Sequence, residues 1–510
     1  MSTVSNSRQE IIRELPDDPK EDVLFDTLYG VRTIELNRPA ALHALSGSMI
    51  RKIAPRLQEW AKSDMANVVV IKGSGDKAFC AGGDVTALAK DNLKGEEGQQ
   101  RSMDYFGLEY KLDHLIATYQ KPFVAFMDGI TMGGGVGLSI HAPFRIATER
   151  TVFAMPETTI GFIPDVGASF FLSRMPGAVG TYLALTSERL KGANVFYSGI
   201  ATHYIHSSTL PALERRLAEL RFRDYDSLVE RNALVNATIE EYCTGLPHDE
   251  PITLSGETRN AIDRCFSKGS VDKIITALEA EEGETKEWAQ KMIKTLHQRS
   301  PTAVHVALRM MQLGQGWKIV EAFQREHQVA GKFMRHPDFT EGVDALLIRK
   351  DKKPKWQPAS LEDIKPDNSA NIVDPFLVVE GNLRLQMLTD SDFSEYPWQR
   401  FSIPRESEVG RLWMRGGQST RRVADIFVEK YKGKQGVKEV VREMLKRRAK
   451  KDENGKPKWL DLTVTPAAPS KPDLPVRLGT PDAEEVLEAQ ENPTGAEIPE
   501  GKEIHEEPKL

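Results

Sequence analysis

The fold is most constrained by three short apolar runs that alternate with segments of helical periodicity. The runs cover residues 68–71, 122–127 and 144–148, and a helical pattern at 101–119 separates the first two. Gly133 opens another helical segment between the second and the third. Short apolar runs of this kind are typical of strands that are buried on both faces. Strands that alternate with helices form layered structures with mostly parallel connections, so an α/β fold is predicted.

The flanking segments extend this pattern in both directions. Alternation at period two over residues 23–36 predicts a hairpin. Ser46 or Ser48 is a candidate N-cap for the helical segment that follows. Residues 208–350 are predicted to be almost wholly helical, and Ser300-Pro301 is a favourable helix start because proline at the first helical position needs no N–H partner.

Composition excludes several classes of protein. Lysine and arginine total 68 against 74 aspartates and glutamates, a net charge of −6, which argues against a wholly basic nucleic-acid coat. No apolar run approaches the ~20 residues that cross a bilayer, so we expect no membrane span. The three cysteines form no CxxC pair and no HExxH motif occurs, so neither a disulfide framework nor a zinc site is expected. The first residues carry acidic side chains and no apolar stretch, unlike a secretory signal or a transit peptide.

Two glycine-rich segments, 79–84 and 129–137, each lie between a predicted strand and a predicted helix. Backbone N–H groups at such junctions have no intrahelical partner, and glycine lets a ligand approach them closely. Two N–H groups that face one point form an oxyanion hole, which stabilises negative charge on a carbonyl oxygen. Close packing of helix against strand is the alternative for either segment alone. Nucleotide binding is disfavoured, because neither segment completes GxGxxG or contains GK[ST].

A third segment, 153–167, sets Glu157 and Asp165 in a mostly apolar stretch rich in proline and glycine. Apolar surroundings disfavour the charged form of a carboxylate, which suits it to acid–base chemistry near neutral pH. Taken alone, each of these acids is better explained as a surface or capping residue.

Together, the three segments resemble the crotonase (enoyl-CoA hydratase/isomerase) superfamily, and its 3-hydroxyisobutyryl-CoA hydrolase branch in particular. The resemblance extends from residue 22 to residue 360, and its most specific parts are Ala81-Gly82-Gly83-Asp84, 129–139 and 153–167. It implies a crotonase (ClpP-like) fold, in which a spiral of ββα units is completed by a helical C-terminal region. It also implies a mitochondrial protein.

The resemblance assigns roles to five residues. The N–H groups of Gly83 and Gly134 would hold the thioester oxygen of an acyl-CoA substrate. Glu157 matches the catalytic glutamate of the family. Asp165 and Glu109 match two acids that contact the substrate, Asp165 beside the catalytic glutamate and Glu109 on the preceding helix.

Gly137 discriminates between reactions. A hydratase of this superfamily has a second glutamate at this position, and glycine cannot move a proton. What remains suits hydrolysis of the thioester of 3-hydroxyisobutyryl-CoA, a step of valine breakdown, in which Glu157 either activates a water or attacks first to give an anhydride. No metal and no cofactor beyond the CoA of the substrate are expected. The alternative, from another class, is a structural ribosomal protein on a crotonase scaffold with vestigial catalysis.

Two nearby side chains are expected to pack rather than react. His43 stands where the family often has asparagine, in a region that normally lies near the CoA moiety. Cys80 neighbours the first glycine-rich segment and is expected to be a buried, inert thiol.

The predicted organisation has four parts. Residues 22–207 form the spiral core with the active site, 208–360 the helical region that completes the hydrolase, 361–460 a basic and partly irregular extension, and 461–510 a tail rich in proline and glutamate. The tail is expected to be disordered or bound to a partner, because its composition cannot bury enough apolar area to fold alone.

The extension is the candidate contact surface. From Arg411 to Lys458, sixteen lysines and arginines stand against six acids, and the densest basic run is 446–451. Basic charge interspersed with aromatics is typical of contact with RNA or an acidic partner, and a solvated basic helix face is the alternative. Members of this hydrolase family occur in the mitochondrial ribosomal small subunit of fungi and some other eukaryotes. The resemblance therefore implies that subunit as a partner through 361–510, with no DNA and no membrane partner.

Overall fold

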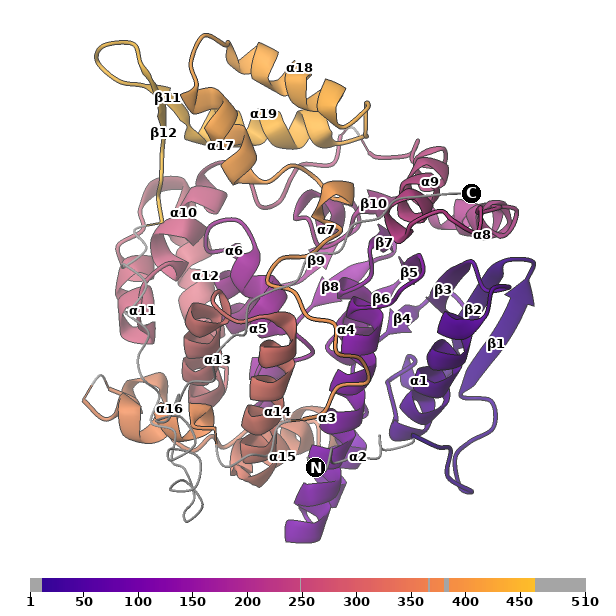
Figure 1. The fold of residues 1–510 in the computed structure, drawn as a ribbon. Helices are drawn as coiled ribbons and strands as arrows, with labels where there is room; N and C mark the ends of the chain where they lie inside the picture. Colours follow the sequence, from indigo (N-terminus) through magenta and orange to yellow (C-terminus); the bar gives the residue numbers. More distant parts are fainter. Residues whose placement is uncertain (1–11, 248, 366, 380–384, 464–510) are drawn as a thin grey trace, which may run out of the picture.

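The computed structural model describes residues 12–463, apart from 248, 366 and 380–384. Two sheets form the centre of the molecule (Figure 1). The larger sheet is parallel except for the hairpin β1–β2, and its order is β1 (Val23–Leu28), β2 (Val31–Leu36), β3 (Val68–Gly73), β5 (Phe123–Met127), β7 (Phe144–Ala147) and β10 (His203–Tyr204). The smaller sheet has the order β4 (Ala78–Cys80), β6 (Ile130–Met132), β8 (Val152–Ala154) and β9 (Leu190–Lys191).

Three successive strand pairs repeat one pattern. The first strand of each pair (β3, β5 or β7) enters the larger sheet and the second (β4, β6 or β8) enters the smaller one. Helices follow each pair: α2 (Val85–Asn92) and α3 (Glu96–Ala117), then α4 (Gly134–Ile140), then the short 3-10 helix η2 (Glu157–Ile160) and α5 (Ala168–Phe171). The expected spiral of ββα units is therefore confirmed.

Predictions from the sequence are confirmed where a helix cap or the alternation of apolar residues defines where an element lies. The hairpin lies at the predicted residues, and its partners run from Val23 opposite Leu36 to Leu28 opposite Val31. The Ser46 side chain, not that of Ser48, caps α1 (Gly47–Lys62). Ser300 starts α13 (Pro301–Gly314) by accepting the N–H of Ala303 at 3.1 Å.

Helices dominate after residue 178, as predicted for 208–350. Helices α10 to α14 lie together on one side of the sheets, where α14 packs along α3, whereas α8 and α9 pack against the larger sheet elsewhere (Figure 1). None of the helices in the described residues is both long and apolar enough to cross a membrane. The helices are α6 (Val179–Thr186), α7 (Ala193–Tyr197), α8 (Leu210–Ala218), α9 (Leu228–Glu240), α10 (Gly256–Phe266), α11 (Val271–Glu279), α12 (Lys286–His297), α13, α14 (Ile319–Arg335) and α15 (Pro337–Val343).

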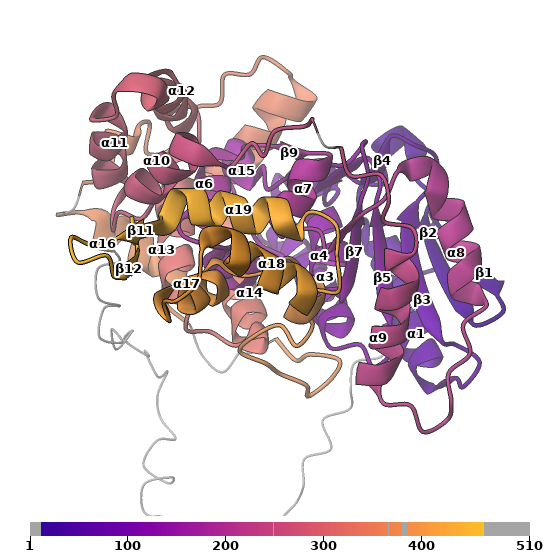
Figure 2. The same cartoon turned by 90° about the horizontal axis from the view of Figure 1, so that it is seen from above.

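The C-terminal segment packs onto this core and is more regular than expected. Its elements are α16 (Ser369–Leu377), α17 (Glu406–Met414), α18 (Thr420–Lys430), α19 (Val437–Arg448) and the hairpin β11 (Ala449–Lys451) and β12 (Pro457–Trp459). Buried Val409, Trp413, Phe427 and Val441 belong to the same hydrophobic cluster as the residues around α5 and α14. Figure 2 shows α17, α18 and α19 lying together over the core. Of the predicted tail, residues 464–510 lie outside the described residues.

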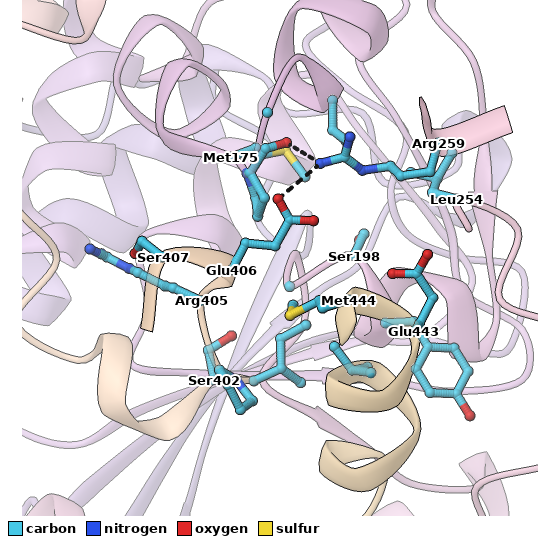
Figure 3. Close-up of a pocket in the computed structure, with 18 of the residues that line it drawn as sticks. Met175, Ser198, Leu254, Arg259, Ser402, Arg405, Glu406, Ser407, Glu443 and Met444 are labelled. Carbon is cyan, nitrogen blue, oxygen red and sulfur yellow. Dashed lines mark hydrogen bonds and ion pairs between the residues drawn. The ribbon is translucent and has the colours of Figure 1, made fainter. Parts of the chain in front are cut away.

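A buried cluster of ion pairs joins the C-terminal helices to α10. Figure 3 shows Arg259 of α10 directed at Glu406 of α17 beside a cavity of about 500 Å³. Arg447 pairs with the same Glu406, and Arg448 pairs with the fully buried Asp263 of α10. Breaking such a pair leaves an unpaired charge in a low-dielectric interior, which costs ~3–5 kcal/mol.

This cluster corrects one expectation for the basic run 446–451. Arg447 and Arg448 are 7% and 3% exposed. They are buried in internal ion pairs and cannot contact RNA. Burial, with two neighbouring arginines, lowers the pKa of Arg447 to about 9. In the sequence these residues look like their exposed neighbours Lys446 and Lys450, because only the packing of α19 on α10 distinguishes them.

Candidate active site

The predicted site residues line one cavity of about 340 Å³. The segment after β4, the start of α4, one face of α3, and η2 with the loop after it each supply part of the wall. Leu346 and Leu347, from the turn that follows α15, close another side. All five residues singled out in the sequence are among those that line the cavity: Gly83, Glu109, Gly134, Glu157 and Asp165.

The two glycine-rich junctions meet at one edge of this cavity. A methyl group placed on Gly134 would lie 3.2 Å from the backbone nitrogen of Gly83, so the two peptides are neighbours. Gly134 is the first residue of α4, where the N–H has no intrahelical acceptor. Within the described residues, neither amide donates a backbone hydrogen bond. The geometry therefore provides two adjacent, free N–H groups, as an oxyanion hole requires.

Carboxylates occupy the space beside residues 133 and 134, where glycine has no side chain. A Cβ atom on Gly133 would lie 2.9 Å from Oε1 of Glu157, and one on Gly134 would lie 2.4 Å from Oε1 of Glu109. Gly133 also has a φ of +45°, in the region that favours glycine. Alanine at either position would displace an acid of the site.

Three carboxyl groups converge beside the amides. Glu157 comes from the first residue of η2, Glu109 from the middle of α3, and Asp165 from the loop before α5. Each is at most 5% exposed. Oε1 of Glu109 and Oε2 of Glu157 have no hydrogen-bond partner among the described residues. Unpaired, buried carboxylate oxygens in a cavity are unusual and mark it as a binding site.

Burial raises the pKa values of all three groups, and the charge of Asp165 adds to this effect at Glu109 and Glu157. Burial, followed by the charge of Asp165, raises the pKa values of Glu109 and Glu157 well above the ordinary glutamate value. Burial raises the pKa of Asp165 to about 7, although the hydrogen bond from Tyr110 lowers it. The site can therefore hold and release protons near neutral pH.

Two residues that the sequence did not single out orient Asp165. The Tyr110 hydroxyl donates to Oδ2 of Asp165 at 2.6 Å. Glu326 of α14 accepts the N–H of Gly167 at 2.6 Å and that of Ser169 at 2.9 Å, which fixes the loop after Asp165. Tyr110 directly follows Glu109 and could have been suspected, whereas nothing near Glu326 in the sequence indicates its role.

The C-terminal segment also reaches this loop. Nε2 of His141 donates to the carbonyl of Val166 at 2.8 Å. Burial lowers the pKa of His141 to about 4, so the ring is neutral and its Nδ1 accepts the Tyr396 hydroxyl at 2.7 Å. A residue beyond position 360 therefore supports the loop that carries Asp165.

Position 137 has no room for a side chain. A Cβ atom on Gly137 would lie 2.5 Å from Oδ2 of Asp113, a fully buried acid one helical turn beyond Glu109 on α3. Neither oxygen of Asp113 has a hydrogen-bond partner among the described residues. The space of the second hydratase glutamate is thus taken by a side chain from another helix.

The expectations for His43 and Cys80 are confirmed. His43 is 2% exposed, donates from Nε2 to the carbonyl of Ser74 at 2.8 Å and accepts the N–H of Arg38 at 2.9 Å, so it holds the loop before α1. Cys80 is fully buried, and burial raises its pKa to about 12, so it remains a thiol. In the part of the chain that is described, no group of three or more His, Cys, Asp or Glu residues is arranged to hold a metal ion.

Comparisons with known proteins identify the family of the chain. The model of the enoyl-CoA hydratase/isomerase family matches residues 31–373. A solved structure described as a carnitinyl-CoA dehydratase from Mycobacterium thermoresistibile superposes with a TM-score of 0.62 at 31% identity, covering 72% of this chain and 100% of that one.

Two kinds of curated relatives are similar to the chain. Small ribosomal subunit protein mS47 of Neurospora crassa is 57% identical over 448 residues, which are 86% of this chain and 88% of that protein. The mitochondrial 3-hydroxyisobutyryl-CoA hydrolase of Danio rerio is 43% identical over 343 residues, which are 67% of this chain and 87% of that protein. From the paired glycine junctions, the buried glutamate beside them and these matches, the chain belongs to the enoyl-CoA hydratase/isomerase (crotonase) family.

Proposed function

We propose that this protein hydrolyses the thioester of 3-hydroxyisobutyryl-CoA in mitochondria and is also a component of the mitochondrial small ribosomal subunit. One observation carries the catalytic part: two free amides and an unpaired Glu157 oxygen line a single cavity. The names of the relatives support both parts, since they include hydrolases and ribosomal proteins.

In the proposed reaction, the N–H groups of Gly83 and Gly134 bind the thioester oxygen and stabilise the negative charge that develops on it. Glu157 takes a proton from water as the oxygen of that water bonds to the carbonyl carbon. The C–S bond then breaks, and the sulfur of CoA takes the proton back from Glu157. The products are the free acid and CoA thiol, so no further reactant is needed.

A second route begins with Glu157 as the nucleophile. Its carboxylate bonds to the carbonyl carbon, and the C–S bond breaks so that CoA leaves as a thiolate. Water then hydrolyses the anhydride to the free acid and protonated Glu157, and the thiolate takes that proton from Glu157. In both routes Asp165 and Glu109 hold the substrate hydroxyl and so orient the thioester. The Tyr110 hydroxyl is a fixed donor to Asp165, because burial raises the pKa of Tyr110 well above its ordinary value.

Hydratase chemistry has less support. It would need a second glutamate at residue 137, where there is glycine and where the Asp113 carboxyl fills the space. The stronger rival is a purely structural ribosomal role, supported by the 57% identity to the relative named mS47.

The decisive assay is release of free CoA from 3-hydroxyisobutyryl-CoA by the purified full chain. Glu157→Gln keeps the size of the side chain and removes its basicity, so turnover should fall at least ~10³-fold while the circular dichroism spectrum is unchanged. Glu97→Gln, on the exposed first turn of α3, is the matched control and should retain full turnover. If the wild-type protein releases no CoA, the hydrolase proposal is refuted and only the structural ribosomal role remains.

A further inference from the structure

A second hollow, which we call the α9 groove, lies between α9 and residues 395–435. Its volume is about 980 Å³, and it shares no lining residue with the active-site cavity. Figure 2 shows that α9 and α18 lie on the same side of the molecule. The groove is therefore separate from the active-site cavity, although Tyr396, which supports the Asp165 loop through His141, also lines it.

The α9 groove carries an excess of positive charge on a chain whose net charge is −6. Three acids line it, and each is paired with one cation of the groove: Glu240 with Lys434, Glu395 with Arg405, and Glu408 with Lys430.

Three further cations line the groove: Arg400, Arg411 and Lys432. All three are exposed, and none has an ion pair in the part of the chain that the structure describes. A ligand can therefore bind them without breaking an ion pair, although Arg400 also lies over the Phe401 ring, 4.9 Å from its centre.

The chemistry of these groups selects the partner. Two of the three free cations are arginines, whose planar forks fit phosphate oxygens in pairs. Tyr431 also lines the groove and is only half-buried, and base rings stack on such side chains. An acidic peptide would use the charges but would gain little from the tyrosine.

We propose that the α9 groove binds the phosphate backbone of single-stranded RNA through Arg400, Arg411 and Lys432. The inference rests on the proposed ribosomal role and names the surface and the partner for it. It also moves the contact away from residues 446–451, where Arg447 and Arg448 are buried in ion pairs.

The test is binding of the full chain to a fluorescein-labelled single-stranded RNA of about 20 nucleotides, measured by fluorescence anisotropy over a range of salt concentrations. The groove variant is R400E/R411E/K432E. The matched control is K446E/K450E/K451E, which makes the same change of charge at exposed lysines of the predicted basic run, outside the groove.

The groove variant should bind at least ~10-fold more weakly, and the slope of log affinity against log salt should fall by about 2, because each lost contact to single-stranded RNA removes ~0.7. The control should stay within ~2-fold of wild type. If the charge reversals disturb folding, as judged by the thermal midpoint, the variant R400Q/R411Q/K432Q should give a smaller loss in the same direction.

Equal weakening by both triple variants, or no effect of the groove variant, would overturn the proposal. So would a polyglutamate peptide of equal length that displaces the RNA as well as unlabelled RNA does. The assay contains neither acyl-CoA nor ribosomes, so it separates the two hypotheses. If the chain sediments with the small subunit but binds no RNA, only the RNA-binding inference is refuted and the proposed ribosomal role stands.

Discussion

Replacing Asp165 with asparagine should stabilise the folded chain, and the gain should grow with pH. Burial raises the pKa of Asp165 to about 7, against 3.8 for an unperturbed aspartate. Between these two values the folded chain keeps a proton that the unfolded chain has released. The penalty for the buried charge is therefore absent below pH 3.8, grows as the pH rises and levels off above pH ~7.

The size of the effect follows from the shift. About three pKa units correspond to a penalty of about 4 kcal/mol at pH 8, and the same relation leaves about 1.6 kcal/mol at pH 5. Asparagine carries no charge, and its side-chain oxygen can still accept the Tyr110 hydroxyl. The gain in the free energy of unfolding over wild type should therefore increase by about 2–3 kcal/mol from pH 5 to pH 8.

Urea denaturation followed by tryptophan fluorescence at about pH 5 and about pH 8 measures this gain. Asp224→Asn, in an exposed turn, is the matched control and should change stability by less than ~0.5 kcal/mol at both values. A gain that does not vary with pH, or an asparagine variant less stable than wild type at pH 8, would refute the assignment of a costly buried charge to Asp165. Turnover should fall in the same variant, because a buried charge that costs the folded chain stability is one that the active site uses.

Two further predictions concern the site. Gly134→Ala should reduce kcat/KM for the acyl-CoA ~10²–10³-fold, because the added methyl group collides with Glu109 and disturbs one oxyanion donor. Shortening Glu109 in the same chain should restore the thermal midpoint but not the rate. Tyr110→Phe removes the hydrogen bond that lowers the pKa of Asp165, so the limb of the pH–rate profile that reports this acid should move to higher pH. An unchanged profile would show that Asp165 does not titrate in the reaction.

The contact between Tyr396 and His141 limits how the C-terminal segment can be tested. Because this contact supports the loop that carries Asp165, deletion of the whole segment would disturb the active site as well as the α9 groove. Charge-reversal variants on the exposed face are therefore preferable to truncation, since they leave the buried ion pairs of Glu406 and Asp263 in place.

The sequence alone determined the motifs and many of the elements of the core, but not the helices of the C-terminal segment. Periodicity and caps are local, so the hairpin, α1 and the start of α13 follow from neighbouring residues. Glycine at a strand–helix junction is a local signal as well, and it indicated the segments 79–84 and 129–137, within which the family resemblance assigned Gly83 and Gly134. The charge excess of the extension could also be counted.

Only the tertiary structure decided which groups meet and which are buried. Glu326 supports the loop after Asp165 from a helix 159 residues further along the chain, and Asp113 fills the space at Gly137 from α3. Arg448 is buried and Arg411 is exposed although both belong to the same basic stretch. Burial and pKa depend on what packs over a side chain, and those neighbours come from distant parts of the chain that no local pattern records.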